Sequence, residues 1–382
     1  MVVPMRRNGL KLLSALMAAI LLITCGAYAS EGLEETGDNF FVSTDPAYEE
    51  LAERVKKTSH SNSFTGSILL AAEDHVILYG GPKAVTTEGR PADMYTTYDI
   101  GSCSKAFTAV AVFQLIEAGL ASLDDPVTKY FPEYETGRDI TLYHLLHMQS
   151  GIADYTNDPE AFWGDVCRQD PEQFTVLFFN DRLSDGDFLR ALYAAPLVFA
   201  PGTEQSYSNT NYHLLAMIVE QVSGMKLNEY LQEHIFDPCG MEHTTSMAIG
   251  DETSVPKLFG DLFSAGIVNE NGYSVQPNSE RGAGGIHTCA ADLWAFDRAL
   301  LSGRLVGGAS LEEMTHFEMD YGCGLYPYGK NAYGHSGRNG TYTMQNVVIE
   351  SERYGRIFLI AATSSDAGSY GLAALTRLIG GI

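Results

Sequence analysis

The sequence predicts an α+β protein in which strands from both ends of the chain form one sheet and the middle of the chain forms a helical lobe. Two apolar strands are predicted near the start, at 64–71 and 75–80, and two near the end, at 342–350 and 356–362. Between them, residues 120–286 are rich in helical patterns that proline and glycine interrupt. This order favours one sheet domain completed by the two termini.

The first 29 residues are predicted to be an export signal. Three basic residues precede a run of apolar residues at 12–25, and Ala27-Tyr28-Ala29 fits a cleavage site. The run is short for a membrane-spanning helix. Cleavage is favoured over lipidation of Cys25, because threonine before that cysteine is a poor match to a lipoprotein signal. We therefore expect an exported protein, attached to a membrane only if Cys25 is lipidated.

Charge and cysteine content exclude several classes of function. The formal net charge is −24 at pH 7, so nucleic acid is not an expected partner. Five cysteines follow the signal, scattered, odd in number and without a CxxC pair, which predicts buried thiols rather than a disulfide framework or a zinc site. No metal and no cofactor are expected.

The remaining chain divides into three predicted regions. Residues 30–45 are expected to be a loosely held acidic leader. Residues 46–118 and 287–382 are expected to form the sheet domain, and 119–286 the all-helical lobe. Beyond the helix that begins near Ser102, helices are predicted at Ala47–Lys57, Leu142–Leu146, Asp187–Tyr193, Tyr212–Val222, Leu227–Ile235, Asp292–Leu301 and Tyr370–Leu378.

The first candidate chemical group is Ser102-Cys103-Ser104-Lys105, at the start of a predicted helix. Ser102 and Lys105 are three residues apart, so both side chains lie on one face of the helix. A serine hydroxyl becomes a good nucleophile when a base removes its proton, and a lysine can be that base where its neutral form is accessible. By itself, the pattern is also typical of an ordinary helix start with a solvated lysine.

Two further groups follow in the order that acyl transfer needs. Tyr207-Ser208-Asn209 lies on a glycine-turned loop before a helix and offers a phenol and an amide. Capping residues of a helix would look the same, and Tyr155-Thr156-Asn157 has the same spacing, although Tyr207 is favoured. His335-Ser336-Gly337, preceded by Gly334, is expected on a strand that a ligand backbone could approach. His335 could hold a substrate carboxylate or assist an oxyanion.

A pair of histidines, His144 and His147, has spacing that would suit a metal on a helix. No third ligand has an obvious spacing to them, so structural roles are favoured over a zinc site.

The three groups together resemble the motifs of the serine β-lactamase and penicillin-binding protein family, in particular its class C-like branch. That branch includes β-lactamases, D-alanyl-D-alanine carboxypeptidases, D-aminopeptidases and esterases. Ser102 to Lys105 matches the first motif, Tyr207 to Asn209 the second and His335 to Gly337 the third. Phrases at 118–130 and 282–287 match as well, and the likeness runs from about residue 60 to the end.

The resemblance implies an antiparallel sheet flanked by helices, a helical lobe and a site between them. Ser102 would be acylated, and Lys105 with Tyr207 would share its proton. Asn209, His335, Ser336, Gly337 and Arg338 would bind substrate, the backbone N–H groups of Ser102 and Arg338 forming the oxyanion hole. Class C β-lactamases carry lysine where this chain has His335, so the likeness is greater to D,D-peptidases and broader hydrolases.

The sequence therefore predicts an exported serine hydrolase that forms an acyl-enzyme on small amides or esters, with D-amino acid peptides as the first expected substrates. A serine esterase or a weak β-lactamase of the same fold is the alternative. A non-catalytic relative that binds cell-wall material or penicillin is the alternative from another class.

Overall fold

The computed structural model describes residues 32–81, 91–164, 184–246, 281–339, 342–364, 366–378 and 382. The predicted export signal, Cys25 and Cys167 lie outside these residues. No helix in the described part of the chain is long and apolar enough to cross a bilayer.

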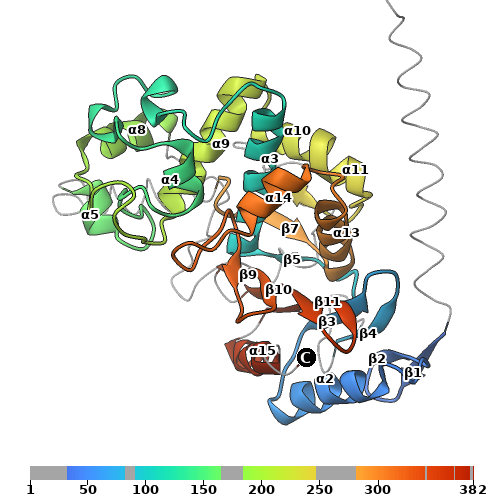
Figure 1. The fold of residues 1–382 in the computed structure, drawn as a ribbon. Helices are drawn as coiled ribbons and strands as arrows, with labels where there is room; N and C mark the ends of the chain where they lie inside the picture. The colour runs from blue at the N-terminus through green and yellow to red at the C-terminus, as the bar shows by residue number, and fades with distance from the viewer. Residues whose placement is uncertain are drawn as a thin grey trace, which may run out of the picture.

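One antiparallel sheet of eight strands runs in the order β1-β2-β4-β3-β11-β10-β9-β8 (Figure 1). Its strands are β1 (Leu33–Thr36), β2 (Phe40–Ser43), β3 (Ser67–Ala72), β4 (Val76–Gly80), β8 (Tyr326–Pro327), β9 (Ala332–Asn339), β10 (Tyr342–Ser351) and β11 (Gly355–Thr363). β3 from the start of the chain pairs with β11 from its end, Leu69 lying opposite Ile360. The predicted α+β sheet built from both ends is confirmed.

The central strands are buried on both faces, and alternate residues enter two separate cores. On β3, Ile68 and Leu70 pack in one core with helices α2 (Glu49–Ser61) and α15 (Asp366–Leu378). Leu69 packs in the other core with α3 (Ser104–Glu117) and α13 (Ala290–Leu301). Figure 1 shows α2 and α15 together on the side of the sheet away from α13. Helices therefore cover both faces, which explains why these strands are almost continuously apolar.

The expectation of a loosely held leader at 30–45 is wrong. This segment contains β1 and β2, and β2 pairs with β4. Phe40, the first residue of β2, is fully buried in the core. Burial of its ring offsets the conformational entropy that the segment loses when it becomes ordered. The acidic side chains of Glu34 and Glu35 are exposed on β1, where charge protects a sheet edge from pairing with another chain.

Two buried helices that pack on each other, α3 and α9 (Asn209–Ser223), join the sheet domain to the lobe. Apolar residues surround α3 on all sides, as expected for a helix in the interior. Of the other helices, α4 (Leu142–Leu146) and α10 (Leu227–Leu231) pack against α9, and α5 (Pro159–Trp163) packs against α8 (Asp185–Ala194). Two more short helices, α11 (Asp237–Cys239) and α14 (Gly308–Met314), complete the set of α-helices among the described residues.

The prediction of an all-helical lobe is wrong at one place. A short strand, β6 (Thr245–Ser246), pairs with β7 (Ile286–Thr288), which in turn pairs with β5 (Tyr98–Asp99). These strands are only two or three residues long, too short for an alternating pattern to be visible in the sequence. The small sheet joins the chain before Ser102 to the chain that leads into α13.

Candidate active site

Ser102 lies in a single turn of 3₁₀-helix, Gly101–Cys103, that leads into α3. This turn packs directly against β9. Gly101 has φ +48°, and a Cβ there would lie 2.7 Å from the backbone nitrogen of Arg338. A Cβ on Gly337 would lie 1.8 Å from the carbonyl oxygen of Ile100. Glycine at both positions is therefore needed for the serine turn and the strand to touch.

The structure brings the Ser102, Lys105 and Tyr207 side chains into direct contact. Tyr207 donates a hydrogen bond from its hydroxyl to Ser102 Oγ at 2.7 Å. Lys105 Nζ donates to the same oxygen at 3.0 Å. Tyr207 comes from the loop before α9, about a hundred residues away, and that loop turns at Gly202 with φ +75°. Two groups capable of proton transfer therefore meet at one hydroxyl.

Lys105 is completely buried, and fixed acceptors surround its nitrogen. Besides Ser102, Nζ donates to Asn209 Oδ1 at 2.7 Å and to the carbonyl oxygen of Ala283 at 2.7 Å. Nζ also lies 4.8 Å from the centre of the Tyr207 ring. Hydrogen bonds and the aromatic face compensate part of the cost of burying this amine.

Burial raises the pKa of the Tyr207 hydroxyl well above its usual range, and the hydrogen bond to Ser102 opposes only part of that rise. The phenol is therefore protonated in the ordinary pH range and acts as a donor to Ser102.

Asn209, the first residue of α9, is held by a loop that lies outside the three sequence motifs of the site. Its Nδ2 donates to Thr156 Oγ1 at 2.6 Å and to Asp154 Oδ2 at 3.2 Å, and its backbone N–H donates to Asp154 Oδ2 at 3.1 Å. With these donors engaged, Oδ1 faces Lys105. Asn209 therefore orients Lys105 in this structure, and its amide donors do not point to an open substrate position.

The competing motif at 155–157 does not supply a phenol to Ser102. Tyr155 is fully buried among the aromatic side chains of the lobe, including Phe188. Its neighbours matter instead, because Asp154 accepts from the Thr156 backbone N–H at 2.8 Å and forms the turn that holds Asn209. Asp154 with Thr156 and Asn157 two and three residues later is a turn signal that the sequence shows, but its partner at 209 cannot be predicted from the sequence.

His335 on β9 lies beside this cluster but does not face solvent; only 3% of its surface is exposed. The Tyr321 hydroxyl lies 3.2 Å from Nε2, and Nδ1 lies 2.5 Å from the carbonyl oxygen of Ser336. Burial, followed by the charge of Lys105, lowers the pKa of His335 to about 3. The imidazole is neutral. Ser336 and Arg338 lie on the exposed face of the strand.

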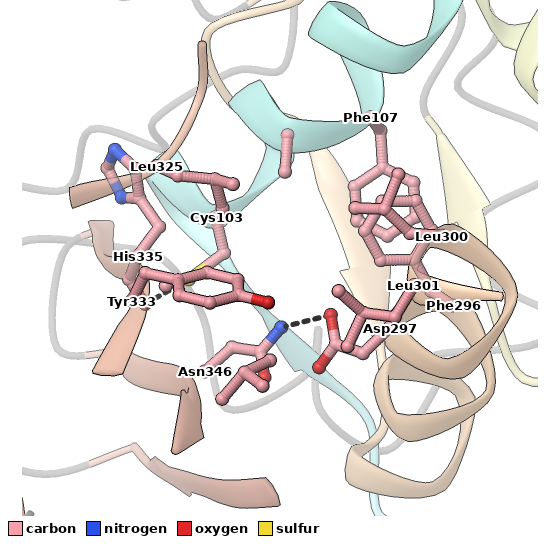
Figure 2. Close-up of a pocket in the computed structure, with 13 residues that line it drawn as sticks. Cys103, Phe107, Phe296, Asp297, Leu300, Leu301, Leu325, Tyr333, His335 and Asn346 are labelled. Atoms are coloured by element: carbon pink, nitrogen blue, oxygen red, sulfur yellow. Dashed lines mark hydrogen bonds between the residues drawn. The ribbon is translucent and has the colours of Figure 1, made fainter. Parts of the chain in front are cut away.

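A small cavity of about 20 Å³ lies behind the serine turn, between α3, α13 and the strands β9 and β10 (Figure 2). Cys103, His335 and Asn346 line it together with Asp297. Asn346 Nδ2 donates to Asp297 Oδ1 at 3.1 Å, whereas Asp297 Oδ2 and Asn346 Oδ1 have no hydrogen-bond partner. Burial raises the pKa of Asp297 to about 7.

The predicted structural roles of His144 and His147 agree with their contacts. His144 forms a capping box with Thr141 at the start of α4. His147 is buried, and its Nε2 lies 3.0 Å from Glu313 Oε1. Among the described residues, one group could bring three ligand atoms near a metal ion, namely His243, Cys289 and Asp292. Asp292 there accepts from the His243 backbone N–H and the Thr244 hydroxyl, which ties β6 to α13.

Known proteins similar to this chain include penicillin-binding proteins. It is 29% identical over 233 residues to a putative penicillin-binding protein, PbpX, of Bacillus subtilis, covering 60% of this chain and 54% of that protein. It is 30% identical over 263 residues to penicillin-binding protein 4* of the same organism, covering 66% of this chain and 55% of that protein. The chain thus spans about half the length of these curated relatives.

Solved structures with the same fold include a penicillin-binding protein from Bacillus halodurans (TM-score 0.65, 22% identity, 85% of this chain and 99% of that chain). A D-stereospecific amidohydrolase from a Streptomyces species is also similar (TM-score 0.62, 24% identity, 85% and 97%). At these identities the likeness shows the fold alone. The family model described as Beta-lactamase matches residues 51–378. This chain therefore belongs to the Beta-lactamase family, whose members are serine hydrolases.

Proposed function

We propose that this protein hydrolyses small amides or esters through an acyl-enzyme on Ser102. The observation that carries the proposal is the pair of contacts at Ser102 Oγ, 2.7 Å from the Tyr207 hydroxyl and 3.0 Å from Lys105 Nζ. A buried amine and a phenol at a helix-start hydroxyl suit nucleophilic catalysis with general acid and base partners.

The geometry supports Lys105 as the proton acceptor and Tyr207 as the proton donor. A neutral Lys105 amine has two N–H bonds and one lone pair. Asn209 Oδ1 and the Ala283 carbonyl take the two N–H bonds, so the lone pair faces Ser102 Oγ and can accept its proton. The raised pKa of Tyr207 keeps its hydroxyl protonated, so Tyr207 is the partner that carries a proton to give to the leaving group. A water molecule then attacks the acyl ester and gives a proton to the Tyr207 oxygen, while Lys105 returns its proton to Ser102 Oγ and the acid product leaves.

The oxyanion would be held by backbone N–H groups of Ser102 and Arg338. The close approach of the serine turn to β9, which the two glycines permit, supports this assignment. Asn209, which the sequence analysis placed against substrate, is proposed to act by orienting Lys105.

Substrates are proposed to be small molecules or peptides. Relatives named as penicillin-binding proteins and a neighbour named as a D-stereospecific amidohydrolase support D-amino acid derivatives. Export is proposed from the composition of residues 1–29. A division into a sheet domain at 46–118 and 287–382 and a lobe at 119–286 is proposed from the order of elements, with β1 and β2 added to the sheet domain and α3 lying between the two parts.

The test is a burst of p-nitrophenol from a p-nitrophenyl ester, with intact-mass detection of an acyl group on the protein. Ser102→Ala is expected to abolish both the burst and the mass increase. Ser122→Ala, a change of another hydroxyl in the loop after α3, is the matched control and should retain both. A burst that survives Ser102→Ala would contradict the proposal, as would the absence of any adduct with the wild-type protein.

A further inference from the structure

We infer that the imidazole at position 335 is a structural hydrogen-bonding group and not a receptor for a carboxylate, so that the site does not favour amides and esters with a free carboxylate on the leaving group over those without one. This inference rests on the proposed function of the same site. It concerns which substrates within the proposed class the site accepts. A peptide with a free C-terminal carboxylate and the corresponding carboxamide differ only in that carboxylate, so comparing them tests the inference.

Both nitrogens of the His335 ring have partners within the protein. Nδ1 faces the Ser336 carbonyl oxygen at 2.5 Å, and a carbonyl can only accept, so Nδ1 carries the proton. Nε2 is then the acceptor for the Tyr321 hydroxyl, 3.2 Å away. In this tautomer the ring has no N–H left to donate to a substrate carboxylate.

The surroundings of the ring also oppose its protonation. The rings of Tyr326, Tyr321 and Tyr207, whose centres lie 5.0, 5.9 and 6.2 Å from that of His335, help to bury it, and burial is the main cause of its lowered pKa. Repulsion between a protonated Lys105 and a protonated ring is, after burial, the second cause of the lowered pKa. With a pKa of about 3, the ring is neutral at pH 7 whether Lys105 is protonated or not.

In this tautomer, His335 also has a structural role in β9. By donating to the Ser336 carbonyl it fixes the backbone of β9 one residue before Gly337, where the strand touches the serine turn. Cys103 supports the same contact, because its Sγ donates to the His335 carbonyl at 3.3 Å. The ring thus orders the strand along which a substrate backbone would lie.

A cation on β9, Arg338, could bind a substrate carboxylate in place of His335. Arg338 lies two residues beyond Ser336 on the exposed face of the strand, so its side chain leaves the crevice in which His335 is buried. Recognition of a carboxylate by Arg338 is the alternative that the experiment must detect.

The experiment compares Nα-acetyl-D-alanyl-D-alanine with its C-terminal carboxamide, which have the same scissile bond. For the wild-type protein, kcat/KM for the carboxamide is expected to equal or exceed that for the free acid. If neither peptide is cleaved, the two are compared as inhibitors of the ester burst, and the carboxamide is expected to inhibit at least as well. A preference of about 10-fold or more for the free acid, roughly 1.4 kcal/mol, would overturn the inference.

Two substitutions of the ring sharpen the result. His335→Lys introduces a cation and is expected to shift the ratio of kcat/KM toward the free acid by about 10-fold. His335→Gln stays neutral and is expected to leave the ratio unchanged, with folding of both variants checked by circular dichroism.

A wild-type preference for the free acid that disappears in Arg338→Ala would overturn the inference and identify Arg338 as the receptor. Loss of the ester burst in the wild-type protein would instead contradict the proposed function.

Discussion

Lys105 Nζ lies 2.7 Å from Asn209 Oδ1, and this contact joins the two helices on which the site is built. Lys105 belongs to the first turn of α3 and Asn209 begins α9. Because Asp154 and Thr156 take the donors of the Asn209 amide, only its oxygen can face Lys105. The position of the amine is thus set by a chain of contacts that ends in the loop before α5.

Removal of either proton-transfer partner is expected to slow acylation. Lys105→Ala and Tyr207→Phe should each lower the rate of the p-nitrophenyl ester burst by at least about 100-fold, the usual scale for a positioned acid or base. Tyr155→Phe makes the same chemical change in the competing motif and should lower the rate by less than about threefold. If both site variants also lost less than threefold, the assigned roles would be wrong.

Asp154 is expected to act on the reaction through Asn209 and Lys105. Asp154→Asn replaces an acceptor of two Asn209 donors, so Lys105 loses its fixed geometry and the burst rate should fall by about 10-fold or more. KM should change little, since Asp154 is buried away from substrate. Asp158→Asn is the matched control, because Asp158 caps α5 at the surface of the same loop. Equal rates for the two variants would exclude this positioning role.

The contact between the serine turn and β9 can be broken with one methyl group. A Cβ on Gly337 would clash with the Ile100 carbonyl oxygen, so Gly337→Ala should lower the free energy of unfolding by about 1–3 kcal/mol. Because the same contact aligns the backbone N–H groups of the proposed oxyanion hole, the burst rate should fall as well. Gly308→Ala, where a Cβ meets nothing within 4 Å, should change neither quantity. Chemical denaturation and burst kinetics measure the two effects separately.

Asp297 is expected to make the stability of the protein depend on pH. Its pKa in the folded protein, about 7, lies above the ordinary value of 3.8. As the pH rises from about 4 to about 7, the unfolded chain loses this proton while the folded chain retains it, so the free energy of unfolding falls. Below about pH 4 and above about pH 7, Asp297 does not make the free energy of unfolding change with pH.

Asp297→Asn should remove that contribution, which is on the order of 4 kcal/mol across the window. The measurement is urea denaturation of both proteins at several pH values between 4 and 8. As the pH rises from about 4 to about 8, the free energy of unfolding of Asp297→Asn is expected to increase relative to that of the wild-type protein. Parallel curves would show that Asp297 has an ordinary pKa in the folded protein.

Much of this protein could be predicted from its sequence because the relevant signals are local. The hydrophobic patterns placed strands at both ends of the chain, and helices such as α4 and α13 follow their predicted ranges closely. Ser102 and Lys105 are one helical turn apart, so their contact depends only on helix geometry. The strands β1 and β2, at one end of the sheet, were missed because their stability comes from pairing and from one buried ring, that of Phe40.

Tertiary structure alone decided how the distant groups meet. The pairing of the turn at Asp154 with Asn209 and the burial of His335 beneath Tyr321 join residues that no sequence spacing relates. The sequence could show that a histidine stands at position 335, but whether it carries charge depends on its exposure and on the cation beside it. Those quantities exist only after the chain has folded, because desolvation and Coulomb interactions depend on distances in space and not along the chain.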